Sequence, residues 1–420
     1  MGVMWAEFGL AANPYATDPI PPSEEGDQLL AGRDAELEEL LARVRAAGAH
    51  PTVEGDDGVG KTSLVSVVCH RLRSEVEQGA SSPVFLPLLG EPVQPRAGHS
   101  VDLFVERVYL RVATTILGER ETLRRRGLRV PDAAEVRDWL RSPIVRGWGA
   151  GVNTSPGDTV AGLLGTVDRW LHELFPGPRS GGFVCVADNL AALETAHGAR
   201  TLLEAIGGPL LDRCGLRWVL CGARGGLRAS ARLPARLGAP LELGPLADED
   251  VEAAVERRLR RYRTSDDATA PIGPSSFRTL YEVLGRDLRE AFTYAEAFSI
   301  WLYSREKTAG TPGELDALFE AWLAGRADLH RRETELGNRA WQVFDQLAAR
   351  RGRCSTGDFE DFGFHTRDAM RTHLAALETQ NLVTTLDNHE NDKRRRTIVL
   401  TPRGWLVRYA RGDHRPPRLV

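Results

Sequence analysis

The stretch TVEGDDGVGKTSLVSVV, residues 52–68, decides the fold of the chain. From Gly55 to Thr62 it matches G-x-x-x-x-G-K-[ST], the pattern of a loop whose backbone amides wrap the phosphates of a nucleotide. A strand-like apolar run precedes the loop, and a helical pattern, KTSLVSVVCHRL, follows it. This context predicts a phosphate-binding loop between a strand and a helix; an ordinary glycine-rich turn is the alternative.

Two side chains of this loop carry most of its chemistry. Lys61 is expected to reach the β- and γ-phosphate oxygens, and Thr62 to offer its hydroxyl to Mg²⁺. The sequence keeps Lys61 although it contains only two other lysines, Lys307 and Lys393. The predicted nucleotide contacts are Gly55, Gly58, Val59, Gly60, Lys61, Thr62 and Ser63.

The loop also holds two carboxylates, Asp56 and Asp57, at positions that can point away from the phosphates. Solvent screening limits their repulsion of a bound polyanion to about 1 kcal/mol each, so the loop tolerates them. As a secondary hypothesis, this acidic rim contacts an arginine of a neighbouring subunit or domain.

A second element of the site is FVCVADNL, residues 183–190, an apolar run that ends in Asp188. A carboxylate at the end of such a strand lies beside the water shell of Mg²⁺ in phosphoryl-transfer sites. A plain core strand is the alternative. Asn189 follows, where many ATPases place the glutamate that orients the attacking water. Because an amide orients water but cannot take its proton, we predict slow hydrolysis, or a base drawn from elsewhere.

Composition excludes several other classes of protein. The hydrophobic fraction of 42% and the charged fraction of 27% are ordinary for a soluble globular protein. No apolar run approaches the roughly 18–20 residues that span a bilayer, and no secretory signal is visible at the N-terminus. Five scattered cysteines favour reduced core thiols over disulfides or a metal site. We expect a cytoplasmic protein without a membrane partner.

Charge is unevenly distributed along the chain. Residues 331–420 hold 17 Lys+Arg against 12 Asp+Glu, a net charge of +5. The first 330 residues hold 37 against 46, a net charge of −9. Only the basic end is therefore a candidate for binding nucleic acid through its charge.

Short apolar runs alternate with helical patterns up to residue 246. Strands are predicted at 51–55, 83–89, 182–188, 216–223 and 240–246, and helices near 31–48, 60–78, 101–118, 158–175 and 196–206. Turn-bounded runs between helices predict an α/β core, 31–246, with a mostly parallel sheet buried on both faces. Residues 1–30 are predicted to be an extended segment, and 119–157 an irregular insertion.

Strand signals stop after residue 246. Helical periods predict an all-helical lid subdomain over 247–330. The segment 331–412 follows the order of a winged helix-turn-helix: helices at 333–350, 355–362 and 366–380, then strands at 382–387 and 397–402 around a charged turn, and a last helix. Residues 413–420 are a tail.

The motifs GxxGVGKTSL, VADN and VLCGARGGLR together resemble the STAND branch of the AAA+-related P-loop ATPases, whose members act as nucleotide-dependent switches. Upstream, NPY…LLAGRDAELEELL is similar to the entry segment of these proteins and of the replication-initiator AAA+ group. In them this segment lies near the adenine, which implicates Tyr15. The resemblance covers roughly residues 13–305, with a winged helix after it, and implies a P-loop NTPase core with ATP/ADP and Mg²⁺ as ligands.

The resemblance also implies roles for three groups of arginines. Arg224 would be the sensor at the end of the fourth strand that detects the γ-phosphate; a surface arginine is the alternative. A lid arginine in GRDLREAF, Arg289 with Arg286 in reserve, would close on the nucleotide. Arg232 and Arg236 are candidates for an arginine finger toward a neighbouring subunit, or solvated charges.

The predicted helix 366–380 has the pattern of a recognition helix. Met370, Leu374 and Leu377 form one stripe, and Arg367 and Arg371, four residues apart, project from another side. Four basic residues follow at the predicted hairpin tip, where a wing contacts phosphates: Lys393, Arg394, Arg395 and Arg396. Duplex DNA is one partner implied; packing or autoinhibition is the alternative use of such a module.

Three functions remain open from the sequence. The first is an ATP-dependent switch whose nucleotide state controls DNA binding or assembly with itself or with partner proteins. The second is a protein-interaction ATPase or scaffold of a bacterial defence or signalling system, in which the winged helix docks partners. The third is a nucleotide-binding structural protein without hydrolysis. ATP is preferred to GTP through the resemblance, and no N-K-x-D motif is present.

Overall fold

The structure is a computed structural model of the chain. It describes residues 2–46, 48–80, 82–94, 100–142, 145, 158–177, 179–188, 190, 196–224, 236–265, 268–386 and 397–412. Two compact units make up the chain: Pro19–Leu243, here called the sheet unit, and Met1–Asp18 with Gly244–Val420, here called the helical unit. No helix in the part that the structure describes is long and apolar enough to cross a membrane.

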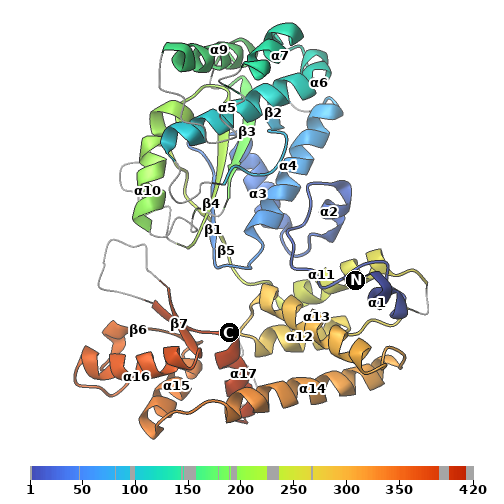
Figure 1. Cartoon of the computed structure of the whole chain (residues 1–420), viewed down its shortest axis with the longest axis vertical. Coiled ribbons are helices and arrows are strands. Elements are labelled where there is room, and N and C mark those ends of the chain that lie inside the picture. The colour runs from blue at the N-terminus through green and yellow to red at the C-terminus, as the bar shows by residue number, and fades with distance from the viewer. Residues whose placement is uncertain are drawn as a thin grey trace. The chain divides into compact units, whose positions relative to one another are not determined.

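The sheet unit is built on five parallel strands in the order β2-β3-β4-β1-β5 (Figure 1). Their bounds are β1 Thr52–Gly55, β2 Val84–Pro87, β3 Gly181–Ala187, β4 Leu216–Gly222 and β5 Leu241–Leu243. All five predicted strands exist, and the predicted parallel α/β core is confirmed. Because all strands run the same way, their carboxyl ends meet at one edge of the sheet, where the phosphate loop begins.

Both faces of the sheet are buried, as the apolar runs predict. On β3, Phe183 and Cys185 contribute to one core and Val184 to the other, since side chains alternate along a strand. The helices of this unit are α2 Glu24–Leu29, α3 Asp34–Arg45, α4 Lys61–Glu77, α5 Val101–Gly118, α6 Arg120–Arg125, α7 Ala133–Arg141, α9 Asp158–Leu174, α10 Ala196–Ala205 and the π-helical turn η2 Gly207–Leu211. Residues of α3 and α4 belong to the core on the side of Val184, and residues of α5 and α9 to the other.

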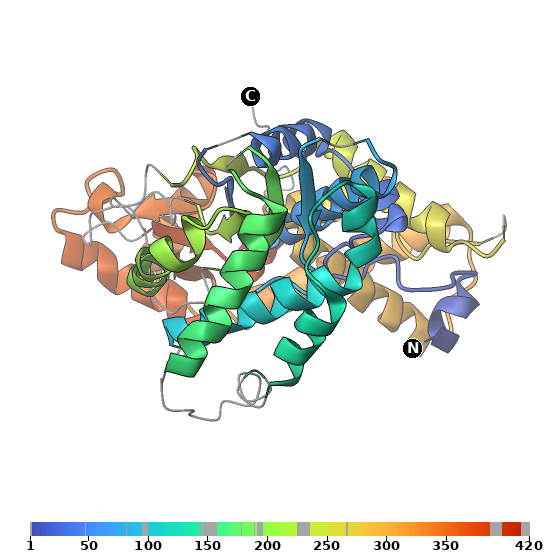
Figure 2. The same ribbon diagram turned by 90° about the horizontal axis from the view of Figure 1, so that it is seen from above.

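The prediction of an irregular insertion over 119–157 is wrong for its first half, which forms α6 and α7. Asp132 caps α7 by accepting a hydrogen bond from the amide of Ala134 at 2.7 Å. Trp139 then packs edge-on against Trp170 of α9, with ring centroids 5.9 Å apart. Helices α5, α7 and α9 therefore form one packed layer (Figures 1 and 2). Helix α7 is only nine residues long. Helices this short are marginal on their own, so its tertiary contacts stabilise it.

The prediction of an extended segment over residues 1–30 is wrong near both of its ends. Residues Gly2–Glu7 form α1, and α2 follows in the sheet unit. Trp5 and Phe8 are buried in the core of the helical unit. Apolar side chains of α1 thus bind this segment to the lid helices, and the Pro- and Gly-rich composition concealed them.

The helical unit contains the four predicted lid helices: α11 Asp248–Tyr262, α12 Pro274–Val283, α13 Leu288–Ser304 and α14 Pro312–Arg332. An aromatic core holds them, in which Phe298 lies 5.3 Å from Phe319 between ring centroids. Thr311 and Glu314 form a reciprocal capping box at the start of α14. The all-helical prediction is therefore confirmed.

Residues 338–410, here called the C-terminal module, follow the predicted order. They form α15 Asn338–Ala349, β6 Arg353–Ser355, the 3₁₀ turn η3 Thr356–Asp358, α16 Arg367–Thr379, β7 Val383–Leu386, β8 Thr397–Leu400 and α17 Pro402–Ala410. Two details differ. The sheet has three antiparallel strands, β6-β8-β7, because β6 pairs with β8, and the short helix predicted at 355–362 is a single 3₁₀ turn.

The domain boundary predicted at residue 331 lies inside the helical unit. Leu406 of α17 is fully buried in the core of α11 to α14. Gly285 has φ +70°, and a Cβ on it would lie 2.1 Å from Nε1 of Trp405. Helix α17 thus packs the C-terminal module directly onto the lid helices, a contact that no sequence motif announces.

Candidate functional site

The phosphate loop connects β1 to α4, as predicted. Gly58 and Gly60 have φ values of +77° and +98°, which L side chains rarely adopt. At Gly55 a Cβ would lie 2.8 Å from the carbonyl oxygen of Leu243 on β5. The glycines of the motif are thus required by backbone conformation and by close packing against the sheet.

Helix α4 begins at Lys61, immediately after the loop. The amides of its first turn have no acceptor within the helix, and the helix dipole adds partial positive charge at this end. No acidic side chain lies in this first turn. Main-chain amides and partial positive charge at this helix end are features suited to binding a phosphate.

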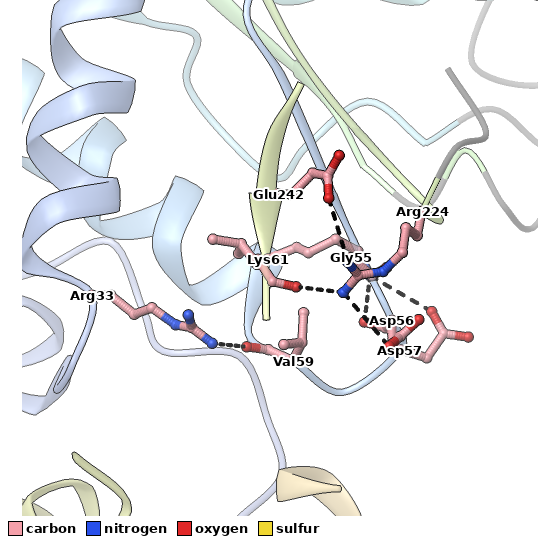
Figure 3. A network of polar contacts seen from close by, with 9 residues as sticks. Arg33, Gly55, Asp56, Asp57, Val59, Lys61, Arg224 and Glu242 are labelled. Carbon is pink, nitrogen blue, oxygen red and sulfur yellow. Dashed lines mark hydrogen bonds and ion pairs between the residues drawn. The ribbon is translucent and has the colours of Figure 1, made fainter. Parts of the chain in front are cut away.

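Lys61 is largely enclosed by the loop, with 11% of its side chain exposed. Its Nζ donates to the carbonyl oxygens of Gly55 and Asp56, at 2.9 Å each, and lies 3.7 Å from Oδ1 of Asp57 (Figure 3). The ammonium group is therefore held inside the phosphate loop by main-chain oxygens.

The hydroxyl of Thr62 donates a 2.7 Å hydrogen bond to Oδ2 of Asp188. Asp188 follows β3 at the carboxyl edge of the sheet and is 6% exposed. The structure thus brings together the two residues that the sequence assigns to Mg²⁺, from segments 126 positions apart. A hydroxyl and a carboxylate are oxygen ligands of the type Mg²⁺ prefers, so this pair fits the ion. The pKa of the nearby Cys221 thiol is raised, mainly because the thiol is buried and secondly because of the negative charge of Asp188.

Arg224 lies just beyond β4, at the rim of the phosphate loop. It donates to Oε2 of Glu242 at 3.4 Å and to the carbonyl oxygen of Leu243 at 3.3 Å. Its NH2 lies 3.8 Å from Oδ2 of Asp56 (Figure 3). The acidic rim therefore contacts an arginine of its own unit, which is the residue predicted to be the sensor.

Arg33 is a site residue that the motifs do not reveal. It is 6% exposed, and its guanidinium donates to Oε1 of Glu36 at 2.8 Å and to the carbonyl oxygen of Val59 at 3.3 Å. Ser63, a predicted contact, accepts a 3.2 Å hydrogen bond from the amide of Ile20. The chain that enters the sheet unit thus supports the loop from outside (Figure 3). The sequence signal for Arg33 is the GRD segment, which the resemblance places near the adenine instead.

Tyr15, predicted to lie near the adenine, is a core residue of the helical unit. Its side chain is 0% exposed. Its hydroxyl donates to the carbonyl oxygen of Ile272 at 2.6 Å and accepts from the Ile272 amide at 3.0 Å. Its ring stacks on Phe277, with centroids 6.3 Å apart. Full burial leaves no surface of Tyr15 for a nucleotide, so this assignment is corrected.

The two lid arginines lie beside the start of α13 in the helical unit. Arg286, at φ +67°, donates to Oδ1 of Asp248 at 2.8 Å, whereas Arg289 is exposed. Arg236 forms two hydrogen bonds with Asp212, at 2.7 and 2.6 Å, within the sheet unit. Closing on a nucleotide and acting as a finger remain predictions for these residues.

Several predicted residues lie outside the described ranges. They are Asn189, Arg232, Lys393, Arg394, Arg395 and Arg396. On α16 the predicted division of faces is confirmed, because Met370, Leu374 and Leu377 are buried whereas Arg367 and Arg371 are exposed. Arg371 also donates to Oδ1 of Asp368 at 3.1 Å.

No protein-family model matches the sequence. No curated protein matches it either. Among solved structures, the chain is similar to the ORC1 protein of Aeropyrum pernix in complex with DNA, at 17% identity and a TM-score of 0.43, over 91% of this chain and 93% of that one. It is also similar to the Walker-type ATPase PABY2304 of Pyrococcus abyssi, at 13% identity and a TM-score of 0.46, over 94% and 99% of the two chains. The fold and the site rest on the strand order and the loop geometry described above.

Proposed function

We propose that the chain binds ATP and ADP with Mg²⁺ and hydrolyses ATP slowly, as a molecular switch. The observation that carries this proposal is the 2.7 Å hydrogen bond between Thr62 and Asp188. A glycine-rich turn without function has no reason to bring its threonine to a carboxylate at the end of a neighbouring strand. In P-loop NTPases a Ser or Thr of the loop and an Asp at the end of a neighbouring strand together hold Mg²⁺.

The proposal assigns a role to the charged and hydroxyl side chains in and around the loop. Lys61 exchanges its carbonyl partners for phosphate oxygens, and the amides that open α4 donate to the same phosphates. Thr62 and Asp188 hold Mg²⁺, which neutralises charge on the phosphates when it is bound. Arg33 keeps the loop in shape through the carbonyl of Val59.

Arg224 is proposed as the residue that reports the nucleotide state. It lies at the rim beside the carboxylates of Glu242 and Asp56 and one carbonyl oxygen, at distances of 3.3 to 3.8 Å. A γ-phosphate is a stronger acceptor than these groups, because it carries more charge. Exchange of Arg224 between the rim and the phosphate links the nucleotide to the end of β4 and to β5.

The output is proposed to be DNA binding through α16. The specific observation that supports it is the exposed pair Arg367 and Arg371 above a buried apolar stripe. A protein-interaction ATPase of a defence or signalling system, with the C-terminal module as docking surface, is the competing proposal. Both proposals are compatible with a homo-oligomer.

The decisive experiment compares wild type with Lys61→Ala and Asp188→Ala. Equilibrium titration with labelled ATP and ADP, with and without Mg²⁺, measures binding, and phosphate release measures turnover. Lys61→Ala is expected to lose most binding. Asp188→Ala is expected to keep Mg²⁺-independent binding and to lose its enhancement by Mg²⁺. GTP serves as the competitor that tests base preference.

Duplex DNA is then added with ATP or with ADP. A switch requires that DNA affinity differ between the two nucleotides, and the difference must disappear in Lys61→Ala. Equal residual turnover in all three proteins would remove the ATPase assignment. Absence of DNA binding at low salt would leave the protein-interaction proposal.

A further inference from the structure

A pocket lies beside the predicted Mg²⁺ ligands in the sheet unit. Thr62 and Asp188 line it, together with the face of α4 that continues from Thr62 and a loop that follows β2. The volume of the pocket that water-sized molecules can occupy is about 150 Å³. This volume holds several waters, so the pocket can supply a nucleophilic water to the metal side of the phosphate loop.

The loop after β2 is firmly held at this place. The amides of Leu88 and Val93 donate to the carbonyl oxygens of Val184 and Val186 on β3, at 3.0 and 2.9 Å. The two donor residues are five positions apart in the chain, whereas the two acceptor residues are only two positions apart. The extra residues, 89–92, therefore bulge out from the edge of β3.

Two contacts from α5 secure this bulge. The Leu89 amide donates to the Thr115 hydroxyl, and Arg111 donates to the Leu89 carbonyl, each at 2.9 Å. Gly90 has φ +90°, and a Cβ on it would lie 1.7 Å from NH1 of Arg111. Glu91 is the next residue, exposed and on the wall of the pocket. Its backbone position is therefore set by bonds on both sides.

Among the described residues of the pocket wall, Glu91 and Asp188 are the two carboxylates. Asp188 accepts from Thr62 and is assigned to the metal ion. His70 also lines the pocket, but it lies eight positions after Thr62 on α4, about 12 Å along the helix. Asp56 lies near Arg224, and Asp57 near Lys61, on the rim. Glu91 is thus the carboxylate best placed to take a proton from a water in this pocket.

We infer that Glu91 is the general base of ATP hydrolysis, in place of the glutamate that Asn189 does not provide. This inference rests on the proposed ATPase function. The Glu91 carboxylate accepts a hydrogen bond from a water, whose oxygen forms a bond to the γ-phosphorus while the bond from that phosphorus to the β-phosphate oxygen breaks. The proton passes to Glu91 and then to solvent, leaving ADP and inorganic phosphate.

The test compares Glu91→Gln with wild type in two measurements. The first is affinity for labelled ATP with and without Mg²⁺, and the second is the single-turnover rate of phosphate release. Glu91→Gln is expected to bind ATP with wild-type affinity and wild-type Mg²⁺ dependence. Its turnover is expected to fall about 100-fold or more, the usual contribution of a general base. Protein recovered after incubation with ATP then retains ATP rather than ADP.

Three further variants make the result specific. Glu91→Asp, which keeps a carboxylate, should recover part of the rate. Glu121→Gln is the control, because Glu121 lies on α6 with 80% of its side chain exposed, and it should change neither measurement. His70→Gln tests the competing base in the pocket.

The inference is overturned if Glu91→Gln hydrolyses ATP at the wild-type rate, if it loses ATP binding, or if His70→Gln abolishes turnover instead. Wild-type protein that binds ATP without hydrolysing it also overturns the inference, while nucleotide binding stands. Wild-type protein that fails to bind ATP overturns the proposed function itself, and the role of Glu91 with it.

Discussion

At the scale of single residues, Asp56 illustrates how a phosphate loop accommodates negative charge. Its carboxylate lies 3.8 Å from Arg224, and the two side chains are 35% and 39% exposed. An ion pair this exposed contributes under about 1 kcal/mol to stability. The pair is therefore weak enough to be exchanged, and in the proposed switch Asp56 would compete with phosphate for Arg224.

Asp56→Asn is expected to raise ATP affinity about two- to fivefold at low salt, because one repulsive charge is removed near the phosphates and Arg224 loses a partner. The gain should shrink at 0.5 M salt, where exposed charges are screened. Titration with labelled ATP at both salt concentrations measures it. Asp57→Asn is the matched control, since Asp57 is 85% exposed and its effect should be smaller. A loss of affinity in Asp56→Asn would show that the carboxylate helps to build the loop.

The residues that the sequence predicts well are those whose chemistry is local. Gly58, Gly60 and Lys61 follow from the loop pattern alone. Arg33 and Arg217 do not, because the carbonyl groups to which they donate are distant in sequence. Arg217 of β4 is buried and donates to three carbonyl oxygens at and just beyond the end of α3, of Arg43 at 2.6 Å, Val44 at 3.0 Å and Gly48 at 2.7 Å. In a chain rich in arginine, no local pattern distinguishes such a cation from a solvated one.

At the scale of elements, His50 attaches the segment just before β1 to the neighbouring strand β4. It is 6% exposed. Its Nε2 lies 2.7 Å from the carbonyl oxygen of Leu211, and its Nδ1 accepts from the Trp218 amide at 3.2 Å. Both contacts are satisfied only by the neutral ring with its proton on Nε2. The pKa of His50 is lowered to about 4, chiefly by burial and also by the positive charge of Arg217, while the Leu211 carbonyl and Asp212 oppose the shift.

The sheet unit is therefore expected to lose stability in acid. Between the ordinary pKa of about 6.5 and the folded pKa of about 4, the unfolded chain binds more protons at His50 than the folded chain does. Stability is thus full above pH 6.5 and falls as the pH drops. From pH 7.5 to pH 5.0 the loss is about 2 kcal/mol. Urea unfolding at the two pH values measures it.

His50→Gln provides the control, because glutamine keeps a donor and an acceptor but does not titrate. Its loss of stability between the two pH values should be smaller than that of wild type by about 2 kcal/mol. Half-buried carboxyls with raised pKa values, such as Glu106, act in the opposite direction and are common to both proteins. An identical pH dependence in the two proteins would contradict the assignment to His50.

Elements with a strong period are predicted from the sequence, and elements that depend on tertiary contacts are not. The five sheet strands and the four lid helices are apolar runs or long amphipathic patterns. By contrast, α7 is short, and β6 has three residues whose strand structure exists only through pairing with β8. Helix α1 was hidden by its Pro- and Gly-rich surroundings.

At the scale of the whole molecule, the proposed switch separates ATP chemistry from DNA contact. The phosphate loop and Asp188, proposed to bind nucleotide and Mg²⁺, belong to the sheet unit, and α16 belongs to the helical unit. The net charge of +5 over residues 331–420, against −9 over the rest, supports the same division. An effect of the nucleotide on DNA affinity would therefore require coupling between the two units. The ratio of the DNA affinities measured with ATP and with ADP gives the free energy of that coupling.

The double variant Arg367→Ala/Arg371→Ala tests DNA contact by α16. If each arginine neutralises one phosphate, the slope of log affinity against log salt should decrease in magnitude by about 1.8, and affinity should fall most at low salt. Fluorescence anisotropy with a labelled duplex at several salt concentrations measures both.

The matched control for this variant is Arg331→Ala/Arg332→Ala. It removes two arginines from the end of α14 in the same unit, where both pair with Asp328 at 2.7 and 2.6 Å. Net charge falls equally in the two variants, so a general effect of charge predicts equal slopes. Contact by α16 predicts a reduced slope only for Arg367→Ala/Arg371→Ala. Equal slopes would exclude α16 as the DNA-binding surface and would favour the C-terminal module as a site for a protein partner.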